Sequence, residues 1–76
     1  MSYWLFKSPR GEFSIVERSS RGVDAYFCGH NIGHFANPIN AARAIGAGSY
    51  EMPEMLADAG PPQDVPADVS DWFYVQ

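Results

Sequence analysis

The sequence predicts a small α+β domain: a three- to four-stranded antiparallel meander, with one short helix packed on one face and an ordered, irregular C-terminal segment on the other. Three observations predict this class. Short segments rich in aromatic and β-branched residues alternate with glycine- and proline-containing turns, and a capped amphipathic segment follows them. The length of 76 residues allows a single domain, residues 1–76. Within it, residues 3–48 are the β-β-β-α unit, and residues 49–76 are expected to dock back.

Three segments of the first half are expected to be the strands of the meander. Residues 3–7 (YWLFK) are aromatic, residues 12–18 (EFSIVER) alternate apolar and polar side chains, and residues 23–28 (VDAYFC) follow the next turn. The turn SPRG places Pro9 and Gly11 where a type I turn prefers them, and SSRG repeats this chemistry before the third strand. Short turns between consecutive strands favour antiparallel neighbours.

The clearest local signal is the start of a helix after a glycine-containing corner. Residues 29–33 (GHNIG) are a predicted turn, and Ile32 and Phe35 are expected to form a short fourth strand or a return to the core. Asn37 can accept hydrogen bonds from helix amides, and Pro38 suits the first helical position. The apolar residues expected on one side of this helix are Ile39, Ala41, Ala42 and Ile45.

Two glycines, Gly46 and Gly48, are expected to end this helix. A helix of about nine residues is unstable alone, so it is expected to pack on the sheet.

The C-terminal third is acidic and rich in proline, but it ends in large apolar residues. Residues 53–60 are expected to make one helical turn, and residues 61–68 are expected to be largely extended. A solvated tail rarely ends in a sequence such as Trp72–Val75. Alternation in the first strand is expected to separate Trp4 and Phe6 from Tyr3 and Leu5, and alternation in the third strand to separate Val23, Ala25 and Phe27 from Tyr26 and Cys28. Because both faces of the sheet therefore carry apolar residues and one short helix covers only one, the C-terminal segment is expected to cover the second face.

Charge and cysteine content limit the cellular setting. Residues 1–48 carry five basic and three acidic side chains, a net charge of +2, whereas residues 49–76 carry six acidic and no basic side chains, a net charge of −6. The single cysteine cannot form an internal disulfide and is typical of a reducing compartment. The longest N-terminal apolar run, residues 3–6, is far shorter than the ~18 residues of a membrane span. We expect a cytoplasmic protein that does not enter a membrane.

Two motifs carry a resemblance to known proteins. They are an IG-x-F-x-x-P-x-x-A-A corner leading into the helix (IGHFANPINAA) and a Ser/Asp-Asp/Glu-Trp segment near the C-terminus (SDWFYV). Together with YWLF, SPRGEFSIV and DAYF, they resemble small uncharacterised bacterial proteins over nearly the whole chain. This resemblance implies a shared fold but no chemistry, because these proteins have no established activity. More distantly, residues 12–48 are similar to the plant ethylene-response (Apetala-type) DNA-binding domain, without its dense set of arginines and tryptophans.

One cluster, Cys28, His30 and His34, holds the candidate metal ligands. The spacing C-x-H-x-x-x-H supplies three ligands, and Asp24 is available as a fourth. Structural zinc generally takes four ligands from two short-spaced pairs, and only one such pair exists here. A catalytic Cys28–His30 pair lacks an identifiable orienting group, and the chain has no phosphate loop and no GxSxG elbow. We therefore expect no enzyme activity, metal or cofactor, and interpret Cys28 as a strand residue and both histidines as exposed turn residues.

Two functions are left, and the sequence favours the first. A non-enzymatic bacterial accessory or protein-interaction module, binding an unknown protein partner or a second copy, fits the excess of aromatic residues and the exposed strand edges. The candidate surface residues are Tyr3, Leu5, Trp72, Phe73 and Tyr74. The alternative is a nucleic-acid-binding module in which sheet aromatics stack on bases. Its candidate phosphate contacts are Lys7, Arg10, Arg18 and Arg21. The net charge of −4 disfavours it, because phosphate attraction dominates such binding.

Overall fold

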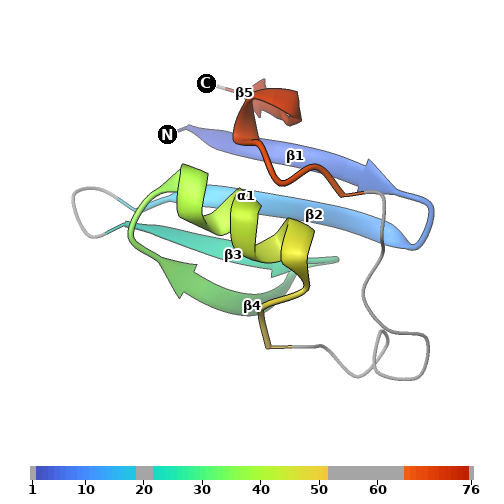
Figure 1. Ribbon diagram of the computed structural model, residues 1–76, viewed down its shortest axis with the longest axis horizontal. Helices are drawn as coiled ribbons and strands as arrows, with labels where there is room; N and C mark the ends of the chain where they lie inside the picture. The colour runs from blue at the N-terminus through green and yellow to red at the C-terminus, as the bar shows by residue number, and fades with distance from the viewer. Residues whose placement is uncertain (1, 19–21, 52–64, 76) are drawn as a thin grey trace.

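The computed structural model describes residues 2–18, 22–51 and 65–75, which form an antiparallel sheet with one α-helix across one face (Figure 1). The elements in chain order are β1 (Tyr3–Ser8), β2 (Gly11–Glu17), β3 (Val23–Phe27), β4 (His30–Phe35), α1 (Pro38–Ala47), the 3₁₀ helix η2 (Val69–Asp71) and β5 (Phe73–Val75). The sheet has five strands in the order β4-β3-β2-β1-β5. The α+β class is confirmed, but the sheet has five strands rather than three to four.

The core lies between the sheet and α1. Strand β2 directs Phe13 and Ile15 toward the helix, and the register places them opposite Phe6 and Trp4 of β1, which therefore share that face. The alternation expected in the first and third strands is confirmed. The buried residues are Phe13, Ile15, Val23, Ala25, Phe27, Ile32, Ala41, Ala42, Ile45, Val65 and Trp72.

A tight turn joins β3 to β4. Cys28 and Gly29 both have positive φ angles, 50° and 86°, as a two-residue hairpin turn of type I′ requires. The predicted turn over residues 29–33 is therefore shorter than expected, and β4 runs from His30 to Phe35 along the full length of β3. Cys28 is an exposed turn residue, so its interpretation as a strand residue is wrong.

Helix α1 begins where the sequence predicts. The Asn37 side chain accepts a hydrogen bond from the Asn40 backbone N–H at 2.7 Å, and Pro38 is the first helical residue. Three of the four apolar residues of the predicted stripe are buried, but Ile39 is 55% exposed. The inward face of the helix is therefore narrower than predicted.

The helix ends at a left-handed C-cap, which is Gly48, the second of the two glycines predicted to end it. Gly48 has φ 75°, and its backbone N–H donates to the Ile45 carbonyl. Gly46 lies inside the helix, and its missing side chain makes room for the chain at Ala67. A Cβ atom at Gly46 would lie 2.7 Å from Ala67 Cα.

The described C-terminal residues, 65–75, pack on the helix side and at the edge of the sheet. Trp72 is only 4% exposed, its ring lies 5.9 Å from that of Phe6, and its indole N–H donates to the Pro66 carbonyl at 3.0 Å. Strand β5 then pairs with β1, on the side of β1 that faces away from β2. For residues 65–75, the expectation that the C-terminal segment covers the opposite face is wrong, because Val65 and Trp72 are buried in the core on the helix side of the sheet. The helical turn expected over residues 53–60, and residues 61–64, lie outside the described residues.

Candidate interaction surface

The sheet face opposite α1, here called the helix-free face, holds the candidate site. Its residues follow from the register of paired strands, since directly opposite residues point to the same face. They are Tyr3, Leu5, Lys7, Glu12, Ser14, Val16, Asp24, Tyr26, Asn31, His34, Phe73 and Val75. The face divides into a mainly apolar half on β5 and β1 and a polar half on β2, β3 and β4.

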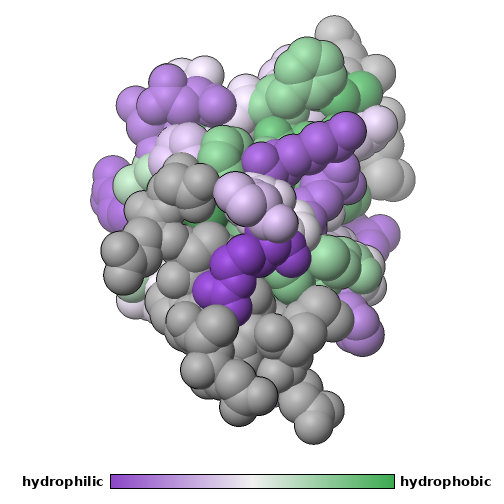
Figure 2. Space-filling view, turned by 90° about the vertical axis from the view of Figure 1, so that its right-hand side faces the viewer, coloured by the Kyte–Doolittle hydropathy of each residue, from purple (hydrophilic) through white to green (hydrophobic). Residues whose placement is uncertain are grey.

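The apolar half, here called the apolar patch, consists of Tyr3, Leu5, Phe73 and Val75. Tyr3 lies opposite Val75 and Leu5 lies opposite Phe73, so the four side chains form two adjacent cross-strand pairs. Phe73 is 69% exposed, and the other three are half-buried. Seen from the end of the β1–β2 hairpin, apolar surface gathers at the upper right, beside hydrophilic surface (Figure 2).

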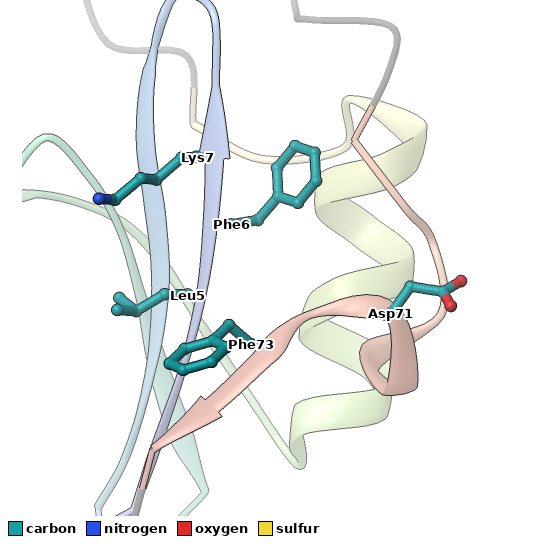
Figure 3. Close-up of a pocket in the computed structure, with 5 residues that line it drawn as sticks. All are labelled: Leu5, Phe6, Lys7, Asp71 and Phe73. Atoms are coloured by element: carbon teal, nitrogen blue, oxygen red, sulfur yellow. The ribbon is translucent and has the colours of Figure 1, made fainter.

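A depression of about 410 Å³ adjoins this patch at the edge of β1 (Figure 3). Its lining residues are Leu5, Phe6, Lys7, Asp71 and Phe73. Leu5 and Lys7 extend from β1 to one side, while Phe6 and Asp71 lie on the side of α1. The depression is thus lined from both faces of the sheet.

The polar half is organised by one carboxylate. Asp24 Oδ2 accepts from Arg18 Nε at 3.0 Å, and Asp24 Oδ1 lies 2.8 Å from His34 Nδ1. Because a carboxylate only accepts, His34 Nδ1 carries the proton in this contact. Arg18 Nη2 also donates to the Tyr26 hydroxyl at 2.7 Å. This network joins Arg18, which follows β2, to Asp24 and Tyr26 of β3, and joins Asp24 to His34 of β4.

These contacts shift the acid–base properties of the network. The hydrogen bond with His34, followed by that with Arg18, holds the pKa of the Asp24 carboxyl below its usual value, against the opposing effect of partial burial. The hydrogen bonds with Tyr26 and then Asp24 raise the pKa of Arg18. The Arg18 guanidinium is therefore already engaged by a carboxylate, which weakens it as a phosphate contact.

The structure separates the three candidate metal ligands. Cys28 lies in the β3–β4 turn, and His30 follows it at the start of β4, opposite Phe27. His34 lies at the other end of the same hairpin, opposite Asp24. Within residues 2–18, 22–51 and 65–75, no group of three or more His, Cys, Asp or Glu side chains is placed to hold a metal ion.

The predicted surface residues have different positions. Tyr3, Leu5 and Phe73 lie on the helix-free face, whereas Trp72 is in the core. Tyr74 lies opposite Trp4, on the helix side of the edge. Its ring is 5.1 Å from that of Trp4, its hydroxyl donates to Ser2 Oγ at 2.9 Å, and it is 49% exposed.

The predicted basic residues are also dispersed. Lys7 is exposed on the helix-free face, Arg10 is exposed in the β1–β2 turn, and Arg18 belongs to the Asp24 network. Arg21 lies outside the described residues.

Sequence reasoning did not identify Val75 or the Asp24 network as part of the site. The signal was present for the network: Asp24 and Tyr26 alternate with the apolar residues Val23, Ala25 and Phe27. In a strand, this alternation places the two polar side chains together on the opposite face.

Comparison with known proteins found no match: neither a family model, nor a curated protein, nor a solved structure matches this chain. In the described part of the chain, no helix has the length and apolar character needed to cross a membrane.

Proposed function

We propose that this chain is a non-enzymatic, cytoplasmic protein-interaction module of a bacterium, and that it binds a partner protein through the apolar patch. The bacterial setting rests on the sequence resemblance described above, and the cytoplasmic setting on the single free cysteine. The observation that carries the proposal is the 69% exposure of Phe73, the most exposed residue of this patch.

The physical support is the apolar area that the patch leaves in contact with water. Fully burying a phenylalanine side chain contributes about 1.5–3 kcal/mol relative to leaving it exposed. Phe73 lies directly opposite the half-buried Leu5, and the Tyr3–Val75 pair is next to it, so the exposed surface is continuous rather than scattered. A continuous apolar surface that includes an exposed aromatic side chain is typical of protein-binding sites.

Nucleic-acid binding has weaker support. Arg18 is paired with Asp24, and Glu12 lies opposite Lys7 on the same face. A phosphate backbone on this face would meet both carboxylates as well as both basic side chains. If the proposal holds, the protein is not retained on single- or double-stranded nucleic acid in a salt-dependent manner.

Site-specific photo-crosslinking tests the proposal. The photoreactive residue p-benzoylphenylalanine is placed at position 73 and, as a matched control, at position 39 in cells of the organism that encodes the chain. Ile39 is also a large exposed apolar residue, but it lies on α1, on the opposite side of the sheet. Adducts with one discrete protein are expected from position 73 and are expected to be absent from position 39.

Three outcomes contradict the proposal. They are equal adducts from both positions, no adduct from position 73, and crosslinking to nucleic acid. A different result is adducts that form only between two copies of this chain. Together with a concentration-dependent mass in sedimentation equilibrium, it would mean that the apolar patch binds a second copy and not another protein.

A further inference from the structure

We infer that the edge of β1 between Phe6 and Ser8 is a strand-addition site, which accepts an extended segment of a partner protein with an acidic side chain opposite Lys7. This inference rests on the proposed function and specifies where and how the partner binds. It follows from the half-occupied edge of β1, the anchoring of Trp72, the shape of the depression and the charge of Lys7.

Among the described residues, β5 fills only half of the position next to β1 in the sheet. Strand β1 has six residues, and β5 pairs with Tyr3, Trp4 and Leu5 only. Among the described residues, no strand pairs with Phe6–Ser8 on this side. At the opposite edge of the sheet, by contrast, the Glu51 backbone N–H donates to the Ile32 carbonyl of β4 at 3.1 Å.

Residues 70–72 do not occupy this half of the edge, because the chain leaves the line of β5 at Trp72 and the Trp72 side chain packs into the core. A straight continuation of β5 would place residues 70–72 opposite Phe6–Ser8. Instead, Trp72 is buried with its indole N–H bonded to Pro66, and residues 69–71 form η2. The Asp68 side chain caps this turn by accepting from the Ser70 backbone N–H at 3.0 Å. Filling the edge with residues 70–72 would expose Trp72 and break both hydrogen bonds.

The depression at this edge has the shape that strand addition requires. An added strand bonds to the edge through its backbone and directs alternate side chains to opposite faces. The depression is lined by three consecutive β1 residues, Leu5, Phe6 and Lys7, and therefore from both faces (Figure 3). Phe73 bounds it where β5 begins, and Asp71 bounds it on the helix side.

The charge of Lys7 determines the preferred residue. Lys7 is exposed and forms no hydrogen bond or ion pair with the described part of the chain. A residue opposite Lys7 on an added strand shares its face, and opposite charges in such a pair attract. The partner segment therefore carries an acidic residue there, between residues that pack near Phe6 and Ser8.

A short synthetic peptide tests the inference. The probe is Thr-Val-Glu-Val-Thr, acetylated and amidated, added to the ¹⁵N-labelled full chain up to about 5 mM because a contact of about three residues is weak. The expected result is saturable chemical-shift change centred on the amides of Phe6, Lys7 and Ser8. The same peptide with an N-methyl group on its glutamate amide is expected to lose most of this binding, because it lacks a backbone donor.

Charge reversal tests the pairing with Lys7. Replacing the peptide glutamate by lysine is expected to weaken binding about two- to tenfold, as cross-strand charge pairs predict. Lys7→Glu is expected to invert this preference. The control Arg43→Glu, an exposed residue of α1, makes the same charge change far from the edge and is expected to leave the preference unchanged.

The results separate this inference from the proposed function. Absence of binding at 5 mM, or shifts centred on the outer edge of β5, overturns the inference. The inference is also overturned if the N-methylated peptide binds as tightly as the unmodified peptide and the shifts lie around Leu5 and Phe73. In that case the apolar patch is still a binding surface. Failure of the position-73 crosslinks with successful peptide binding overturns the apolar patch as the main contact. If Lys7→Glu fails to fold, the binding of the glutamate, lysine and N-methylated peptides to the unmodified chain decides whether the inference holds.

Discussion

The two faces of the sheet use the same strands in different ways. On the face beneath α1, Phe13, Ile15 and Phe27 are 0% exposed, whereas no large side chain of the helix-free face is fully buried. Trp72 and Phe73 show the contrast between consecutive residues, at 4% and 69% exposure. One face thus supplies the core of this small domain, and the other carries the exposed apolar patch and a polar network.

The largest expected difference between the faces is at these two consecutive aromatic residues. Trp72→Ala is expected to cost about 3–5 kcal/mol, because it leaves a cavity beside Phe6 and removes the hydrogen bond to Pro66. A domain of this length has only about 4–11 kcal/mol of total stability. Phe73→Ala is expected to cost less than about 0.5 kcal/mol, because its side chain is already in water.

Urea denaturation followed by far-UV circular dichroism measures both costs. Equal costs for the two variants would contradict the division of the sheet into a buried core face and an exposed helix-free face.

Local chemistry explains which parts of the fold could be predicted from the sequence. The Asn37 cap, Pro38 and the alternation in β2 and β3 depend on neighbouring residues, and all were predicted. The pairing of β5 with β1 joins residues about 70 positions apart, and a strand as short as Phe73–Val75 has no periodicity of its own. The apolar end of the chain predicted that it docks, but the predicted side was wrong for residues 65–75.

The candidate site was predicted to a similar extent. The alternation of β1 placed Tyr3 and Leu5 on the open face, but the side taken by Trp72 depends on its contacts with Phe6 and Pro66. Cys28 was misinterpreted because the sequence Cys-Gly is a weak signal for a type I′ turn, which asparagine or aspartate before glycine would have marked more strongly.

Gly46→Ala is expected to have the second largest effect on the free energy of unfolding. Whether it raises or lowers this free energy tests the packing on the core face. In an exposed helix, Gly→Ala stabilises by about 1 kcal/mol. Here the new Cβ would lie 2.7 Å from Ala67 Cα and 2.9 Å from its backbone nitrogen, so the segment must move. Overpacking of this kind costs typically about 1–3 kcal/mol. We therefore expect Gly46→Ala to destabilise the domain, measured by the same urea titration.

A helix control makes this result interpretable. Asn40→Ala also raises helix propensity, but Asn40 is exposed on α1, and only its backbone N–H is used by the cap. It is expected to stabilise by a few tenths of a kcal/mol. If Gly46→Ala stabilises as Asn40→Ala does, residues 65–67 do not pack closely on α1 in solution.

The smallest expected effect concerns the polar half of the helix-free face. Asp24→Asn removes the charge that holds Arg18 and His34, and it is expected to lower the melting temperature by about 2–5 °C, as for a partly exposed ion pair in a domain of this size. Glu17→Gln is the matched control, since Glu17 is exposed and its carboxylate has no ion pair with the described residues. It is expected to change the melting temperature by less.

The pH dependence of the difference in melting temperature between the unmodified chain and Asp24→Asn shows whether the ionised Asp24 carboxylate causes it. Because the pKa of Asp24 is lower in the folded state than in the unfolded chain, the folded state binds this proton more weakly. The stabilisation by the carboxylate is therefore complete above the ordinary aspartate pKa of about 4, and it is lost as the pH falls through the lower folded value. The melting temperatures of the unmodified chain and Asp24→Asn are expected to converge as the pH falls below about 4. A difference that stays constant over this range would mean that the side-chain amide disturbs packing, and that the ionised carboxylate does not stabilise this face.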